Sequence, residues 1–129
     1  MTKQEKRERN ERLQERLILF ASNVIDITES LPASAIGRHF ADQASRSGSA
    51  PARQYAEAQG AESGPDFVHK IKVGLKELRE TFVTLRIISL RNWVNDEKMV
   101  PLLQENNELI SIFISIILSA LGPDDEEST

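Results

Sequence analysis

A chain of 129 residues, 40% hydrophobic and 28% charged, has the size and composition of one soluble globular domain. It contains no Cys, which excludes a disulfide framework and thiolate chemistry. The net charge is −4, and the acidic stretch at 124–127 accounts for all of it, so the total charge does not indicate a nucleic-acid partner.

The sequence gives no sign of a membrane segment. The longest apolar stretch, 109–121, is 13 residues long, whereas a helix that spans a bilayer needs roughly 20. The N-terminus is charged throughout and does not resemble a signal peptide. We therefore expect a cytoplasmic protein with no membrane partner.

The first predicted helix spans about residues 5–30. Pro32 cannot continue a helix and disfavours helical geometry in the residue before it. The first three turns are charged, and we expect them to project or fray. Apolar residues recur at steps of three and four, which indicates one buried seam: Leu13, Leu17, Phe20, Val24, Ile27 and Leu31.

The second predicted helix, 34–60, includes the stretch "RSGSAPARQYAEAQ", which mixes turn and helix residues. A structureless loop of this length is improbable inside a compact domain, and Ser34 can cap a helix. We therefore predict a helix with a kink at Pro51, whose small residues allow another backbone to come close. The alternative is two short helices broken near Ser49.

The third predicted helix, 64–92, begins with Ser63 as its cap and Asp66 at the capping-box position. The fourth, 99–121, has Pro101 in its first turn and ends at Gly122. We expect the acidic tail, 122–129, to be disordered.

The pattern predicts an all-α protein, and no strand pattern is present. Four helices joined by short connections favour an antiparallel up-down-up-down four-helix bundle, formed by residues 1–121 as one domain.

The fourth helix is apolar over most of its circumference, with one polar arc of Gln104, Glu108, Ser111, Ser115 and Ser119. A helix of a monomeric bundle needs an apolar stripe only somewhat over 100° wide. We therefore predict that a second subunit covers this helix, and that the interface contains Leu109, Ile112, Phe113, Ile116 and Ile117.

The middle of the chain resembles a known family. The resemblance is carried by Gln43, "RSGS" at 46–49, "YAEAQ" at 55–59, "ES" at 62–63, "DFVHK" at 66–70 and "KELRE" at 76–80. These residues resemble the bacterial four helix bundle protein family, also called the 23S rRNA intervening-sequence protein family. The chain departs from the family pattern at Gln54, where Asn is usual, and at Gly64 and Pro65, where a polar or basic residue is usual.

The resemblance implies a four-helix protomer that assembles into a homopentamer and has no enzymatic activity. The accessory protein of diversity-generating retroelements looks like a relative. That protein is a pentameric barrel that binds nucleic acid and a reverse transcriptase through basic surfaces, so RNA, DNA and a reverse transcriptase are the partners that the resemblance suggests.

One basic stripe follows the third helix, formed by His69, Lys72, Lys76, Arg79 and Arg86. Such a stripe could bind the phosphates of RNA or DNA. The alternative is a solvated face in which Lys76 pairs with Glu80 four residues later. No aromatic residue interleaves with the stripe, so the sequence does not support base stacking.

Residues that would carry catalysis are not arranged in any recognisable motif. There is no nucleophile in a strained turn and no Gly-rich phosphate loop. Asp66 and His69 form one carboxylate–histidine pair, whereas a di-metal bundle needs two such pairs and two further Glu. We therefore expect no enzyme, cofactor or metal. Structural salt bridges between the second and third helices are expected from Arg46, Glu57, Glu77 and Glu80.

Two functions follow as expectations. The first is an oligomeric, non-enzymatic nucleic-acid-binding accessory protein that uses the basic stripe. The alternative is a protein-interaction scaffold that uses the charged first helix and the surface of the oligomer.

Overall fold

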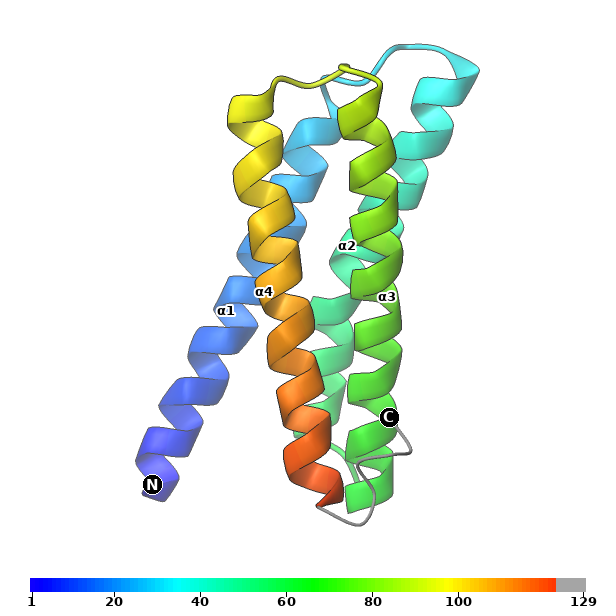
Figure 1. Cartoon of the computed structure of the whole chain (residues 1–129). Helices are drawn as coiled ribbons and strands as arrows, with labels where there is room; N and C mark the ends of the chain where they lie inside the picture. The colour runs from blue at the N-terminus through cyan, green and yellow to red at the C-terminus, as the bar shows by residue number, and fades with distance from the viewer. Residues whose placement is uncertain (123–129) are drawn as a thin grey trace.

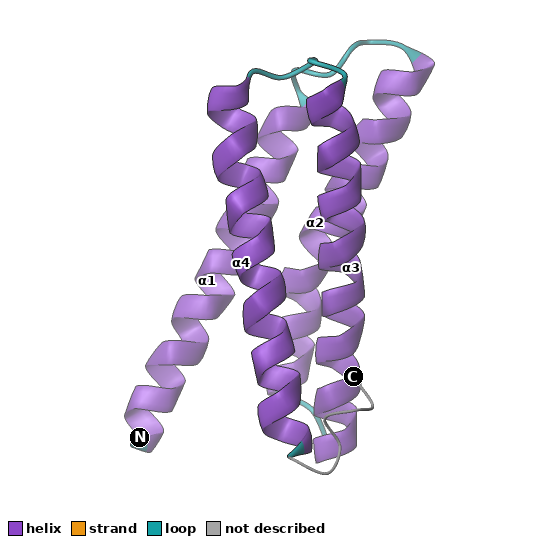
Figure 2. Cartoon of the chain, in the orientation of Figure 1, coloured by secondary structure: helices purple, strands orange, loops and turns teal. Residues whose placement is uncertain are grey.

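Each helix begins after a polar residue whose side-chain oxygen accepts a hydrogen bond from the backbone N–H three residues later. These caps are Thr2, Ser34, Ser63 and Asn95. The computed structural model describes residues 1–122 and contains four helices, shown in Figures 1 and 2: α1 (Lys3–Thr28), α2 (Ala35–Gln59), α3 (Gly64–Leu90) and α4 (Asp96–Leu121). The acidic tail predicted to be disordered lies, apart from Gly122, outside the described residues.

The predicted bounds of the first three helices agree with the structure to within two residues. The predicted start of α4 at residue 99 is wrong, because Asn95 caps this helix through Lys98 N–H at 3.0 Å. Asp96 and Glu97 then occupy the first turn, where carboxylates interact favourably with the helix dipole. Pro101 consequently lies inside the helix and not in its first turn.

α2 is one continuous helix, so the alternative of a break near Ser49 is wrong. The hydroxyl groups of Ser45, Ser47 and Ser49 all donate to the carbonyl four residues earlier, at 2.7 to 2.9 Å. These bonds satisfy the polar side chains within their own helix. The glycine at position 48 brings α1 close, since a Cβ there would lie 2.9 Å from Val24 Cγ1.

The helices pack in chain order as an antiparallel up-down-up-down bundle, which confirms the predicted fold class (Figure 1). α2 packs against α1 and α3, and α3 packs against α4, whereas α1 and α4 are the least closely packed of the neighbouring pairs. The N-terminal half of α1 leans away from α4 in Figure 1. It stays on α2 through Asn10, which donates to Gln59 at 3.1 Å, and Gln14, which donates to the carbonyl of Ala52 at 2.9 Å.

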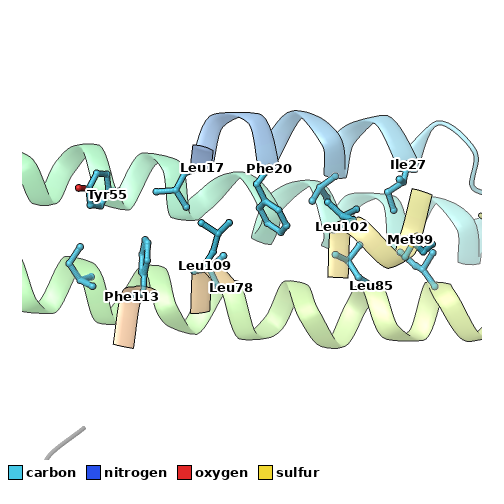
Figure 3. Packing of buried hydrophobic residues seen from close by; sticks show 14 of the residues in the cluster. Leu17, Phe20, Ile27, Tyr55, Leu78, Leu85, Met99, Leu102, Leu109 and Phe113 are labelled. Carbon is cyan, nitrogen blue, oxygen red and sulfur yellow. The ribbon is translucent and has the colours of Figure 1, made fainter. Parts of the chain in front are cut away.

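The core runs the length of the bundle and draws on all four helices (Figure 3). Phe20, Leu78 and Phe113 are almost completely buried in it. Two polar contacts interrupt the apolar packing. The hydroxyl of Thr81 donates to Ser47 Oγ at 2.9 Å, and Asn106 Nδ2 donates to the carbonyl of Leu78 at 3.0 Å.

The apolar arc of α4 is used mainly within the protomer, which corrects part of the predicted oligomer interface. Leu109, Phe113 and Ile117 are 0%, 0% and 2% exposed in the single chain, so they have no surface left to give to a partner. Figure 3 shows Leu109 and Phe113 pointing into the interior. Ile112 and Ile116 are half-buried and pack against the same core. The arc is wide because α4 has neighbours on two sides, α1 and α3.

Within residues 1–122, no helix has the length and apolarity needed to cross a membrane.

Candidate nucleic-acid interface

Five residues of α3 form what we call the basic face: His69, Lys72, Lys76, Arg79 and Arg86. All are exposed except Lys72, which is half-buried. They lie on the outer surface because the opposite side of α3 carries the buried residues Ile71, Leu78 and Leu85. The structure therefore places every predicted residue of the stripe on one solvent-facing side of the bundle.

The basic face borders α4. Three of its residues, Lys72, Arg79 and Arg86, are seven positions apart and so form one row along α3. Lys72, the first residue of the row, lines a groove together with Ala120 and Leu121 of α4, which places this end of the row beside α4. The row thus follows the outer side of the seam between α3 and α4.

A second, open groove runs along the outer surface of α3. Lys72, Lys76 and Arg79 line it, together with the apolar side chains Leu75 and Val83. Gln43 and Arg46 of α2, the carboxylate Glu80 of α3 and Ile117 of α4 also line it. Arg46 is a residue of this groove that the sequence pattern did not assign to the basic surface, because its distance from α3 along the chain hides the contact.

The carboxylates of α3 at this groove pair with α2, and one of them, Glu80, itself lines the groove. Arg46 pairs with Glu77 at 3.4 Å and with Glu80 at 3.7 Å, and Lys70 pairs with Glu57 at 3.8 Å. The predicted salt bridges between the second and third helices are therefore present. Glu80 pairs with Arg46 and has no ion pair with Lys76, so the predicted local Lys76–Glu80 pair does not form.

Among these carboxylates, Glu77 is the one whose charged form is disfavoured by its surroundings. Burial raises its pKa above the ordinary value, and the neighbouring charge of Glu80 raises it further, while Arg46 acts in the opposite direction. Burial outweighs Arg46 because that guanidinium is more than half exposed and its charge is screened by water.

The carboxylates in the middle of α4 are turned toward α1. Arg16 of α1 binds Glu105 through two bonds of 2.7 Å and reaches Glu108 at 3.3 Å. These bonds and the charges of both glutamates raise the pKa of Arg16, although burial opposes them. This contact joins α1 and α4, which are the least closely packed of the neighbouring helices. It also places the two carboxylates of α4 on the side that faces α1 and not on the side that faces α3.

The result is a separation of charge around α3. No carboxylate within residues 1–122 forms an ion pair with Lys72, Lys76, Arg79 or Arg86. These four cations therefore form no ion pair within the described part of the protomer, although the carboxylate Glu80 lines the same groove as three of them. A surface of this kind attracts polyanions and can contact phosphate oxygens.

The polar residues Ser63 and Asp66 at the first turn of α3 have a structural role, which is to cap the helix. Ser63 Oγ accepts from the N–H of Asp66 at 3.1 Å, and the Asp66 carboxylate accepts from the N–H of Glu62 at 3.3 Å. Asp66 thus holds the helix start, close to the predicted capping box. His69 lies beside Pro65 and Phe67 in the groove at this end of α3. The described residues contain no group of three His, Cys, Asp or Glu that could hold a metal ion.

Comparisons with known proteins agree with the resemblance. The model of the family described as "23S rRNA-intervening sequence protein" matches residues 9–115. A solved structure from Bacteroides thetaiotaomicron, described as a protein with unknown function from the S23 ribosomal protein family, is 25% identical. The alignment covers 81% of this chain and 96% of that one, with a TM-score of 0.75. No curated protein gives a significant match.

Proposed function

The chain belongs to the 23S rRNA-intervening sequence protein family, and we propose that it is a non-enzymatic nucleic-acid-binding module that acts as a homo-oligomer. The observation that supports this function best is the basic face, whose four permanent cations have no carboxylate partner in residues 1–122. The carboxylate that lines the same groove, Glu80, pairs with Arg46 of α2 instead.

The proposed contacts go to phosphates and not to base edges. Lys and Arg side chains on a rigid helix position a protein on the backbone of a nucleic acid. α3 is flanked by α2 and α4, so it cannot enter a groove as an isolated recognition helix. Binding should therefore depend weakly on sequence and strongly on salt.

Assembly into an oligomer would strengthen such binding. One protomer offers four permanent cations on this face, and each phosphate contact contributes modestly. Several copies that act together make the contacts multivalent and raise the overall affinity. The resemblance to the family suggests five copies.

Exposed apolar residues support self-association, and the most exposed of those considered lie on α1 and α3. Ile18 and Ile25 are seven residues apart on α1 and are about half exposed, and Leu90 of α3 is 71% exposed. Large apolar side chains grouped on a surface are typical of contacts with another chain. We propose that these residues, with the half-buried Ile112 and Ile116, contribute to the interface.

Light scattering tests the oligomer. At micromolar concentration we expect a mass that is a multiple of the 14.5 kDa chain, and we expect replacement of Ile18 and Ile25 by Asp to lower it. A wild-type mass near that of one chain would contradict the proposal. Circular dichroism of the variant serves as a control for folding.

A binding titration tests the nucleic-acid function. The variant Lys72→Ala/Lys76→Ala/Arg79→Ala should bind labelled RNA and DNA at least about ten-fold more weakly than wild type, because three phosphate contacts are lost. The matched control is Lys6→Ala/Arg7→Ala/Arg12→Ala, which removes the same charge from exposed positions of α1. Equal affinity of the wild type and the α3 variant, or no binding at low salt, would reject the function and favour the protein-interaction scaffold.

A further inference from the structure

We propose that the basic face recognises double-stranded nucleic acid through its phosphates, in preference to a single strand. This inference rests on the proposed function and names the class of ligand. It follows from the position of the aromatic residues, the spacing of the cations and the rigidity of the helix that carries them.

The aromatic side chains are unsuited to binding a single strand. Proteins that bind single strands stack successive bases on exposed aromatic rings. The chain has seven Phe, Tyr and Trp residues, all within the described part, and none of them is exposed. Three are buried, and Phe40 and Trp93 contact each other edge to face with ring centroids 5.9 Å apart. His69 is the one exposed ring on the basic face, so no row of stacking platforms exists.

The cations are spaced for a regular array of phosphates. Lys72, Arg79 and Arg86 follow one another at seven-residue steps, which correspond to about 10.5 Å along a helix. The major groove of B-form DNA is about 12 Å wide. On B-form DNA, neighbouring cations of the row can therefore reach phosphates on the two sides of the major groove. Lys76 lies between the first two and can follow one of the strands.

The row is held in place by the packing beneath it. Leu78 and Leu85, on the inner side of α3, are completely buried, and Thr81 is bound to Ser47 of α2. A row of charges carried on a rigid helix meets a fixed row of phosphates without ordering the ligand. A flexible single strand would lose conformational entropy to match the same positions.

Charge density favours the same ligand. A DNA duplex carries one negative charge per about 1.7 Å of its axis and releases about 0.9 counterions for each phosphate neutralised, against about 0.7 for a single strand. Every contact made by a cation of the basic face therefore yields more counterion release with a duplex. Because the face has no stacking platform, a single strand has no compensating interaction.

The test is a competition titration by fluorescence anisotropy at low salt. The ligands are a duplex DNA, a duplex RNA of the same length, and unstructured single strands of that length, including oligothymidylate. We expect both duplexes to bind about five-fold or more tightly than any single strand. Replacement of Lys72, Lys76 and Arg79 by Ala should reduce that preference.

The outcomes separate this inference from the function on which it rests. Single strands that bind as tightly as the duplexes, or more tightly, would overturn the preference for a duplex and leave the nucleic-acid function standing. The absence of binding to every ligand would overturn both. A preference for a duplex that the α3 variant retains in full would place the contact on another surface and overturn the assignment to the basic face.

Discussion

The two sides of α3 use charge and packing in opposite ways. On the side that faces α2, charged and polar side chains pair within the protomer: Arg46 binds Glu77 and Glu80, and Thr81 binds Ser47. On the side that borders α4, Lys72, Arg79 and Arg86 have no carboxylate partner in residues 1–122. The first side stabilises the fold, and the second is available for a ligand. Substitutions on the two sides should therefore change different measurements.

A large effect on stability is expected at the close contact between α1 and α2. Gly48→Ala places a Cβ 2.9 Å from Val24 Cγ1, and Val24 is buried and stiff at χ1, so it cannot move aside. Overpacking of this kind costs about 1–3 kcal/mol. Chemical denaturation measures it, and Gly64→Ala is the control because its Cβ meets no atom within 4 Å. Equal stabilities of the two variants would contradict the close packing of α2.

The buried hydroxyl pair should have the next largest effect. Thr81→Val keeps the shape of the side chain but removes the group that lies 2.9 Å from Ser47 Oγ. The Ser47 oxygen then loses the Thr81 donor but keeps its own bond to the carbonyl of Gln43, and the bond from Thr81 to the carbonyl of Glu77 is lost as well, which together costs about 1 kcal/mol. Thr84→Val, on the half-buried rim of the groove, is the matched control. A Thr81→Val protein as stable as the control variant would show that this bond contributes nothing.

The bundle was predictable from the sequence because apolar residues at steps of three and four, together with Ser34 and Ser63, report local structure. The start of α4 was missed because Asn95 and Pro101 both mark helix starts, and a proline is tolerated near the beginning of a helix. The role of Leu109 and Phe113 was missed for a different reason. A helical wheel shows how wide an apolar arc is, but it does not show how many neighbours the helix has.

The charge pattern was predictable only in part. The basic face itself was visible, since its residues are close together in the chain and share one side of a helix. The absence of ion pairs on this face could not be predicted from the sequence, because it depends on contacts between residues that are far apart in the chain. Arg46 pairs with Glu80, which lies 34 positions later in the sequence, and Arg16 pairs with Glu105, which lies 89 positions later. Sequence spacing alone favoured the local Lys76–Glu80 pair, which the structure does not contain.

A smaller effect is expected from the acidic tail. Deletion of 123–129 removes four carboxylates and no described contact. Less negative charge on the protein should raise its affinity for nucleic acid by a few-fold at low salt, and the gain should fade as salt screens the charges. A titration against the same duplex measures it. A loss of affinity on deletion would indicate that the tail itself takes part in binding.

The smallest effect is the pH dependence due to Glu77. Its pKa is raised in the folded protein, first by burial and then by Glu80. The folded state therefore binds this proton more tightly than the unfolded state, so stability falls as the pH rises from the ordinary value of 4.5 through the folded pKa. Glu77→Gln should flatten this decline in a pH series of thermal unfolding. A decline of the same steepness in both proteins would contradict the assignment.

The central claim is that Lys72, Lys76 and Arg79 contact phosphates, and the salt dependence of duplex binding tests it most directly. The slope of log K against log salt counts the phosphates neutralised, at about 0.9 per contact. The account predicts that replacing the three residues by Ala makes the slope shallower by about 2.7 for each protomer engaged, whereas the Lys6/Arg7/Arg12 control keeps the wild-type slope. Equal slopes for the wild type and the α3 variant would contradict it.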